Sequence, residues 1–186
     1  MLWIGNRTRN FPGAHIEFFR NIENVIGLKV DSSLGIEEFI KIVQTLNPSN
    51  FQNKLIVITR FGAGKVKESL SQMAEAKQKF GLNFLWMSDP MHGNTYTSSL
   101  SNVKTRDFSS ILNELLEVTS TLSCFNETLH GIHLEASFEK VTEVIGGVHH
   151  PIREEQLNLN YKSGCDPRLN AFQTLDLISE FGRRKV

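Results

Sequence analysis

The chain has 186 residues, of which 40% are hydrophobic and 22% charged, and this composition is typical of a globular domain with a buried core. Lysine and arginine together number 20, as do aspartate and glutamate, and this balance argues against a broad surface for nucleic acid or for an anionic membrane. No apolar run approaches the ~20 residues of a membrane-spanning helix, and two cysteines are too few for a disulfide framework. Because residues 1–9 also lack the apolar segment of a signal peptide, we expect a cytoplasmic protein.

Five short apolar runs along the chain have the length of buried β-strands. In chain order they are residues 25–28, 55–59, 84–87, 131–134 and a weaker run at 157–161. Each run ends in, or leads into, a charged or metal-binding side chain, in the same order Lys29, Arg60, His92, Glu135 and Asp166. In a parallel sheet the carboxyl ends of all strands lie at the same end of the sheet, where α/β proteins place their active sites.

Amphipathic helical patterns follow most of these runs. Apolar faces at helical spacing cover residues 36–46, 66–80, 111–122 and 169–178. We expect Asn47-Pro48, Gly81 and Gly182 to end three of these helices. Cys124 continues the apolar pattern of the third helix, so we expect its side chain in the core.

Strands that alternate with helices at this spacing predict one α/β domain over residues 1–186, with a parallel sheet and about five βα units. A complete eight-stranded β/α barrel typically takes ~250 residues. The chain is therefore expected to form a partial TIM-type β/α barrel or a smaller open sheet. In either case two sheet edges need cover.

One imidazole and two carboxylates, those of His92, Glu135 and Asp166, are expected to meet at the carboxyl edge of the sheet. This mixed set suits Mn²⁺, Fe²⁺, Co²⁺ or Zn²⁺, with coordination positions left open for a substrate. The alternative is that His92 is an ordinary loop residue, since it follows Asp-Pro. His133 would face the same side of its strand as Glu135 and could pack beside the site without binding metal. The histidines that compete as ligands are His130, His133, His149 and His150.

Lys29 and Arg60 end apolar strands, where a charge is costly unless it is paired or faces a ligand. Together with Arg7 and Arg9 near the chain start, they would suit an anionic, phosphorylated substrate. Structural salt bridges are the alternative, with two acidic partners available, Asp31 and Glu37.

The segment Gly-Ala-Gly-Lys at residues 62–65 invites a phosphate-loop interpretation. The spacing of that motif fails, because Thr59 stands where its first glycine belongs and Val66 follows Lys65. We therefore expect a strand-to-helix turn here.

Taken together, these segments resemble the class II (plant-type) 3-deoxy-D-arabino-heptulosonate 7-phosphate (DAHP) synthases. The matching stretches keep their order and spacing along the whole chain, which makes the match specific. They are residues 3–9, 13–15, 27–29, 59–62, 89–95, 104–106, 133–135, 141–143 and 165–170. The resemblance covers only the C-terminal part of the family's barrel, about its last five strands.

The resemblance implies that His92, Glu135 and Asp166 bind a divalent metal, with Mn²⁺ expected and Co²⁺ as the alternative. It also implies that Lys29 and His92 are catalytic. The phosphoenolpyruvate site it implies consists of Asn6, Arg7, Lys29 and Arg60. Two more residues would lie near the mouth of the site in a role that stays open, Lys104 and Arg106.

The activity implied by the resemblance is a transferase reaction, the condensation of phosphoenolpyruvate with erythrose 4-phosphate. This reaction opens the shikimate pathway to chorismate and the aromatic amino acids. The unmatched N-terminal part of the family carries a cysteine metal ligand, another phosphoenolpyruvate-binding arginine and the Lys-Pro-Arg-Ser segment that meets erythrose 4-phosphate. We do not expect Cys165 to replace that cysteine.

We therefore expect an incomplete or split synthase, completed by a separate N-terminal half or by a homo-oligomer. The alternative is a non-catalytic remnant, or a regulatory or partner subunit that retains the metal and phosphoenolpyruvate half-site. Two departures from the family favour this alternative somewhat. Asn6 stands where the family has glutamate, and Asp31-Ser32 stand where it has Gly-Pro, so Asp31 brings a negative charge near the anion site.

Overall fold

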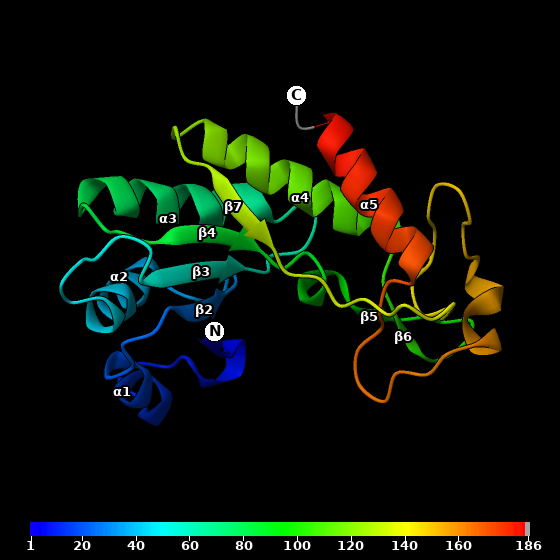
Figure 1. Ribbon diagram of the computed structural model, residues 1–186, viewed down its shortest axis with the longest axis horizontal. Helices are drawn as coiled ribbons and strands as arrows, with labels where there is room; N and C mark the ends of the chain where they lie inside the picture. Colours follow the sequence, from blue (N-terminus) through cyan, green and yellow to red (C-terminus); the bar gives the residue numbers. More distant parts are fainter. Residues whose placement is uncertain (185–186) are drawn as a thin grey trace.

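The computed structural model describes residues 1–184 and is built around a five-stranded sheet in the order β1-β2-β3-β4-β7 (Figure 1). All neighbouring strands run parallel. The strands are β1 Leu2–Ile4, β2 Ile26–Val30, β3 Leu55–Thr59, β4 Leu85–Ser88 and β7 Leu129–Ile132. The predicted α/β class is confirmed, and the arrangement is consistent with a partial β/α barrel.

Helices connect the strands and pack in chain order, α1 on α2, α2 on α3, α3 on α4 and α4 on α5. They are α1 Ala14–Arg20, α2 Ile36–Leu46, α3 Val66–Lys79, α4 Phe108–Ser123 and α5 Ala171–Arg184. Two short strands pair separately, β5 Tyr96–Thr97 with β6 Lys104–Thr105. Three 3-10 turns complete the described elements, η1 Asn6–Thr8, η2 His92–Asn94 and η3 Glu154–Leu159.

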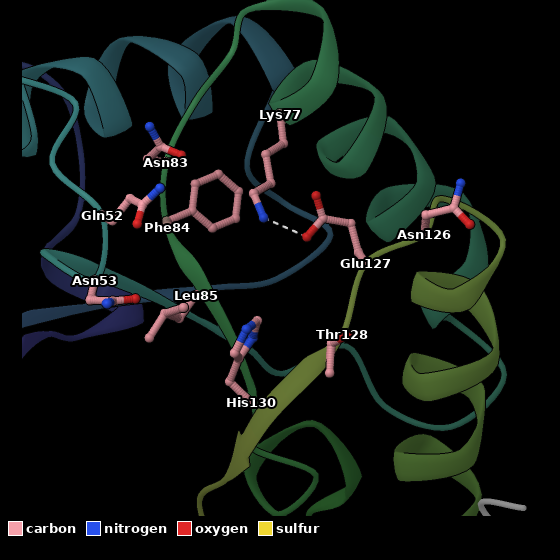
Figure 2. Close-up of a pocket in the computed structure, with 10 residues that line it drawn as sticks. All are labelled: Gln52, Asn53, Lys77, Asn83, Phe84, Leu85, Asn126, Glu127, Thr128 and His130. Carbon is pink, nitrogen blue, oxygen red and sulfur yellow. Dashed lines mark hydrogen bonds and ion pairs between the residues drawn. The ribbon is translucent and has the colours of Figure 1, made fainter.

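A polar cavity of about 300 Å³ lies near the amino ends of β4 and β7 (Figure 2). Lys77 and Glu127 form an ion pair in its wall, and the exposed His130 lines it. Because the predicted site residues follow the opposite, carboxyl ends of the strands, His130 is not a competing ligand for that site.

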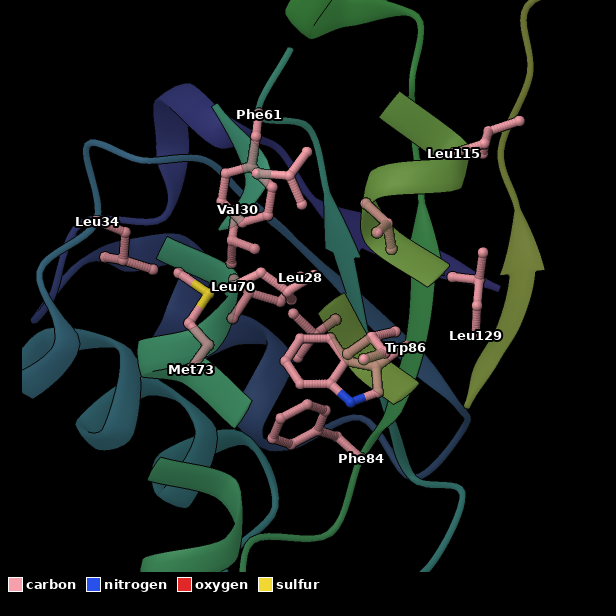
Figure 3. Packing of buried hydrophobic residues seen from close by; sticks show 14 of the residues in the cluster. Leu28, Val30, Leu34, Phe61, Leu70, Met73, Phe84, Trp86, Leu115 and Leu129 are labelled. Atoms are coloured by element: carbon pink, nitrogen blue, oxygen red, sulfur yellow. The ribbon is translucent and has the colours of Figure 1, made fainter. Parts of the chain in front are cut away.

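The core lies between the sheet and the helices that cover it (Figure 3). Leu28, Trp86 and Leu70 are fully buried there. The indole of Trp86 packs edge-to-face on Phe84, and its N–H donates to Glu127 at 3.1 Å. The buried polar atom is thus satisfied, as a packed core requires.

The sheet is curved enough to bring its two edges toward one another. The ring of Trp3 in β1 contacts that of His133, directly after β7, with 5.5 Å between ring centroids. These residues come from opposite edges of the sheet, so the strands enclose a trough rather than a flat surface. Among the described residues, no further strand pairs with the outer edge of β1 or of β7.

Several sequence predictions are wrong in detail. The weak run 157–161 is no strand, because residues 154–159 form the 3-10 turn η3, with only Leu157 buried. Cys124 is exposed, because it lies two residues after the buried Leu122 and therefore off the buried face of α4, which ends at Ser123. Gly182 does not end the last helix, which continues to Arg184.

The predicted strands at 25–28, 55–59 and 84–87 and the four predicted helices are present, and the strand predicted at 131–134 begins two residues earlier, as β7. Gly81 follows α3 with a φ of +59°, which is the left-handed conformation expected of a helix-ending glycine. No helix within residues 1–184 is long and apolar enough to cross a membrane.

Candidate metal and anion site

His92, Glu135 and Asp166 come together beyond the carboxyl ends of the strands, as the sequence predicts. One potential ligand atom from each residue lies within 4.8 Å of those of the other two. His92 begins η2 after β4, Glu135 follows β7, and Asp166 lies in the loop before α5. All three are partly accessible, so a cation and a substrate can reach them.

Asp89 orients the imidazole of His92. Its carboxylate lies 2.7 Å from Nδ1 and also accepts the backbone N–H groups of Met91 and His92. With Nδ1 held by a carboxylate, Nε2 is the atom that faces Glu135, at 3.1 Å from Oε1. One imidazole nitrogen and two carboxylate oxygens that all lie within 4.8 Å of one another form a donor set typical of divalent transition metals. The residues therefore fit a divalent cation.

Asp89 also binds the ammonium of Lys29, at 2.7 Å, and both side chains are buried. Burial alone would raise the pKa of Asp89, but His92 and Lys29 outweigh it and hold this pKa well below its usual range. The hydrogen bonds to Asp89 and then to Glu135 raise the pKa of His92. Lys29 is thus paired within the site, and neither of the acidic partners considered from the sequence is involved.

Arg106 is a fully buried residue of this site whose role the sequence left open. Its Nη1 lies 2.6 Å from Oε2 of Glu135, and the same nitrogen donates to the carbonyl oxygen of Pro167. Its Nε donates to Oγ1 of Thr95 at 2.8 Å. Although burial raises the pKa of Glu135, His92 and Arg106 together lower it to about 2. Arg106 therefore positions Glu135 and the loop that carries Asp166.

Arg60 lies beside the metal-site loop. Its Nη2 donates to the backbone oxygen of His92 at 3.5 Å. Within residues 1–184, the buried Nε of Arg60 and Nη2 of Arg106 have no hydrogen-bond partner. Because buried N–H groups normally have acceptors, these two favour an anionic ligand at this place. Lys104 is more exposed, with its ammonium 3.4 Å from Asp166, and forms part of the rim.

Asn6 and Arg9 take part in a separate network with Asp31. Asn6 donates to the Asp31 carboxylate and accepts from Arg9. Arg9 also lies 3.0 Å from Asp31 and donates to Oγ of Ser33 at 2.9 Å. The charge of Asp31 is thus neutralised by Arg9. Arg7 is exposed and makes no ion pair with another described residue.

The loop 62–65 is a strand-to-helix turn, as predicted, and its amides are already used. Asn94 accepts the N–H of Ala63 at 2.9 Å, and Glu117 accepts that of Gly64 at 2.9 and 2.8 Å. An anion-binding loop needs free N–H groups, so this segment is not a phosphate loop.

His133 lies beside the metal cluster, with its ring centroid 6.4 Å from that of His92 and 5.5 Å from that of Trp3, which it meets edge to face. This matches the expectation that it packs near the site. Cys165 is exposed, with Sγ 3.5 Å from Oδ2 of Asp166. His149 lies elsewhere, paired with Asp176 at 2.5 Å.

Sequence reasoning missed Asp89 and Glu114, and each left a signal. A buried lysine at a strand end requires a carboxylate, and Asp89 stands directly after β4. Glu114 lies three residues after Ile111 on the apolar face of α4, a position typical of a buried side chain.

Comparison with known proteins identifies the family. Residues 1–181 match the Class-II DAHP synthetase family. The chain is 40% identical over 178 residues to a phospho-2-dehydro-3-deoxyheptonate aldolase of Neurospora crassa, a match that covers 95% of this chain and 37% of the relative. Enzymes of the same name from Streptomyces coelicolor and Mycolicibacterium smegmatis are each 39% identical over 95% of the chain.

These alignments cover 39% of the Streptomyces relative and 38% of the Mycolicibacterium relative. The chain thus spans less than two fifths of the length of the curated relatives that it matches. The family match runs over residues 1–181, and the chain brings a metal-capable cluster, a lysine and two arginines together beyond the carboxyl ends of its strands. The chain belongs to the class II DAHP synthase family.

Proposed function

We propose that this chain forms the metal and phosphoenolpyruvate half of a DAHP synthase, the C-terminal portion of its barrel. Completed by a second half, it condenses phosphoenolpyruvate with erythrose 4-phosphate, the first step of the shikimate pathway. The observation that carries this proposal is the convergence of His92, Glu135 and Asp166 within 4.8 Å. Lys29 and Arg60 beside this cluster supply the cationic groups that an enol phosphate needs.

His92, through Nε2, and the carboxylates of Glu135 and Asp166 would hold the divalent metal, with Mn²⁺ as our assignment and Co²⁺ as the alternative. When bound, this ion acts as a Lewis acid toward the aldehyde oxygen of erythrose 4-phosphate. The mixed imidazole and carboxylate set is compatible with either ion. Asp89 keeps the imidazole in the required tautomer.

Lys29, Arg60 and Arg7 would hold the phosphate and carboxylate of phosphoenolpyruvate. In the condensation the methylene carbon bonds to the aldehyde carbon, water adds at C2, and the bond from C2 to the phosphate oxygen breaks. Fixed cations contribute by aligning the enol with the aldehyde and by stabilising negative charge. The unpaired Nε of Arg60 is a donor available for this purpose.

A complementing chain would cover the surfaces that this one leaves open. The outer edges of β1 and β7 are unpaired within the described residues. Three apolar side chains on one face of α5 are exposed, Phe172, Leu175 and Ile178. Open strand edges and apolar helix faces favour association. We therefore infer that the chain alone binds both ligands weakly and turns over negligibly, and that a separate N-terminal half, or a homo-oligomer, completes it.

The second candidate is a non-catalytic partner or regulatory subunit. The observation that favours it is the Asn6–Asp31–Arg9 network, which occupies the place where the family has a glutamate and a Gly-Pro turn. In that case the chain would retain the metal and phosphoenolpyruvate half-site without turnover.

A mixing experiment distinguishes these functions. The purified chain is assayed with Mn²⁺ and both substrates, alone and together with the N-terminal part of the Neurospora relative. We expect heptulosonate phosphate only from the mixture, and none when the chain carries His92→Ala. Turnover by the chain alone at roughly 1 s⁻¹ or more would refute the split enzyme. No turnover in the mixture, with binding of Mn²⁺ and phosphoenolpyruvate intact, would support the regulatory subunit.

A further inference from the structure

The loops after β3 and β4 carry Arg60 and His92, and they are packed backbone to backbone. Gly62 has a φ of +89°, and a Cβ at this position would lie 2.7 Å from the backbone oxygen of Gly93. A Cβ on Gly93 would lie 2.4 Å from the backbone nitrogen of Gly62. Only glycine fits at both positions, so the anion-site loop and the metal-site loop are in direct contact.

A carboxylate from α4 binds both loops. Glu114 is fully buried, and its Oε1 accepts the backbone N–H of Phe61 at 2.9 Å. Its Oε2 accepts from the side-chain amide of Asn94 at 2.7 Å. Asn94 in turn accepts the N–H of Ala63 at 2.9 Å and donates to the oxygen of Pro90 at 2.8 Å.

The burial of the Glu114 carboxylate lowers the stability of the fold and is therefore not explained by core packing alone. Among residues 1–184, no cationic group forms an ion pair with Glu114. Burial raises its pKa to about 7, against the opposing effect of the Gly62 and Phe61 amides. A buried charge without a cation costs folding free energy, and an apolar residue of similar size would avoid that cost. Its hydrogen bonds to the two site loops point to a functional reason for the carboxylate.

We propose that Glu114 is a positioning residue that holds Arg60 against His92 and thereby couples anion binding to metal binding. The coupling runs through backbone contacts, since Phe61 directly follows Arg60 and Asn94 lies two residues after His92. The 3.5 Å contact from Arg60 Nη2 to the backbone oxygen of His92 is the link that this arrangement maintains. This role rests on the proposed function, because it presumes that Mn²⁺ and phosphoenolpyruvate bind here.

Glu117 provides a matched control. It lies one helical turn further along α4 and also accepts a backbone N–H from the same turn, that of Gly64 at 2.8 Å. It makes no hydrogen bond to Asn94 or to any other residue of the metal-site loop among the described residues. Glu117→Gln therefore perturbs the turn without removing the link between the two loops.

The test measures phosphoenolpyruvate affinity of the whole chain with and without Mn²⁺, for wild type, Glu114→Gln and Glu117→Gln. The positioning role predicts that the factor by which Mn²⁺ strengthens phosphoenolpyruvate binding falls about fivefold or more in Glu114→Gln and is unchanged in Glu117→Gln. The Mn²⁺ affinity itself should change little, because Asp89 still orients His92. A lower melting temperature with an unchanged coupling factor would overturn the proposal and leave Glu114 a structural residue.

A second measurement is independent of ligands and of the proposed function. In NMR spectra of the ligand-free protein, Glu114→Gln should shift both the Arg60 Nε–H resonance and the His92 imidazole resonances, whereas Glu117→Gln should shift neither. Unchanged resonances in Glu114→Gln would refute the positioning role. If the shifts occur but the wild type binds neither ligand, the proposed function fails, while the mechanical link between the loops stands.

Discussion

Replacement of Arg106 by methionine tests how the site is held together. Methionine keeps an unbranched apolar stem but removes the guanidinium that contacts Glu135, Thr95 and Pro167. Removing one partner of a buried ion pair costs about 3–5 kcal/mol, and an orphaned buried acceptor about 1–3 kcal/mol. Because the Glu135 side chain is 25% exposed, water can replace part of the lost interaction. We therefore expect a loss of about 3 kcal/mol in the free energy of unfolding.

The same substitution should weaken Mn²⁺ binding about 10–100-fold, since Glu135 and the Asp166 loop lose the group that orients them. Urea unfolding measures the first effect and Mn²⁺ titration the second. Lys104→Met is the control. The Lys104 side chain is 54% exposed and its ammonium lies 3.4 Å from Asp166 at the rim, and an exposed ion pair of this kind contributes only about 0–1 kcal/mol. Equal stability and equal Mn²⁺ affinity in the two variants would refute the role assigned to Arg106.

Three further predictions concern stability. The site lowers the pKa of Glu135 to about 2 and that of Asp89 below its usual range, so the stability that these groups contribute is present at neutral pH. This stability should be lost as the pH falls below about 4.5, and the urea midpoint should fall with it. The fall of the midpoint with pH should be smaller in Glu135→Gln. The raised pKa of Glu114 acts in the opposite direction. The stability that Glu114 contributes is complete below pH about 4.5 and is lost as the pH rises through about 7, a loss of about 3 kcal/mol in the free energy of unfolding. Glu114→Gln should abolish this dependence of stability on pH, and a variant that retains the wild-type dependence would contradict the prediction. Gly93→Ala should destabilise the protein by about 1–3 kcal/mol in urea unfolding, because the new Cβ would lie 2.4 Å from a backbone nitrogen. Gly164→Ala is the control and should be nearly neutral, because a Cβ there would have no atom within 4 Å. Similar losses of stability in both variants would refute the close contact of the two loops.

The central strands and the helices could be predicted because their pattern is local. A continuous apolar run such as 55–59 indicates a strand that is buried on both faces of the sheet. Apolar residues at helical spacing indicate a helix with one buried face. The convergence of His92, Glu135 and Asp166 could be predicted from a single rule, that the carboxyl ends of parallel strands lie at the same end of the sheet.

Features that depend on distant partners could not be predicted. β1 has only three residues and becomes a strand because it pairs with β2. Asp89 and Lys29 are 60 residues apart in the chain, so the buried lysine signals that a carboxylate is needed, but the sequence does not say which one. The burial of Arg106 has no local signal at all, since its partners Glu135 and Pro167 come from loops far along the sequence.

The alternation of apolar and polar residues in the run 157–161 is typical of a strand, but it also fits a tight turn. The side chain of Gln156 accepts the backbone N–H of Arg153 at 2.8 Å, which stabilises the start of η3. Only Leu157 is buried there, so the segment has no apolar face to place on a sheet.

The most direct test of the metal site is a Mn²⁺ titration of the purified chain, read by calorimetry and by electron paramagnetic resonance. We expect one ion bound per chain in the wild type, with binding lost or weakened at least tenfold in each of His92→Ala, Glu135→Gln and Asp166→Asn. Binding should be unchanged in His130→Ala, whose side chain lies at the opposite end of the sheet. A wild-type chain that binds no Mn²⁺, or binds it equally well in all of these variants, would contradict the assignment of this site.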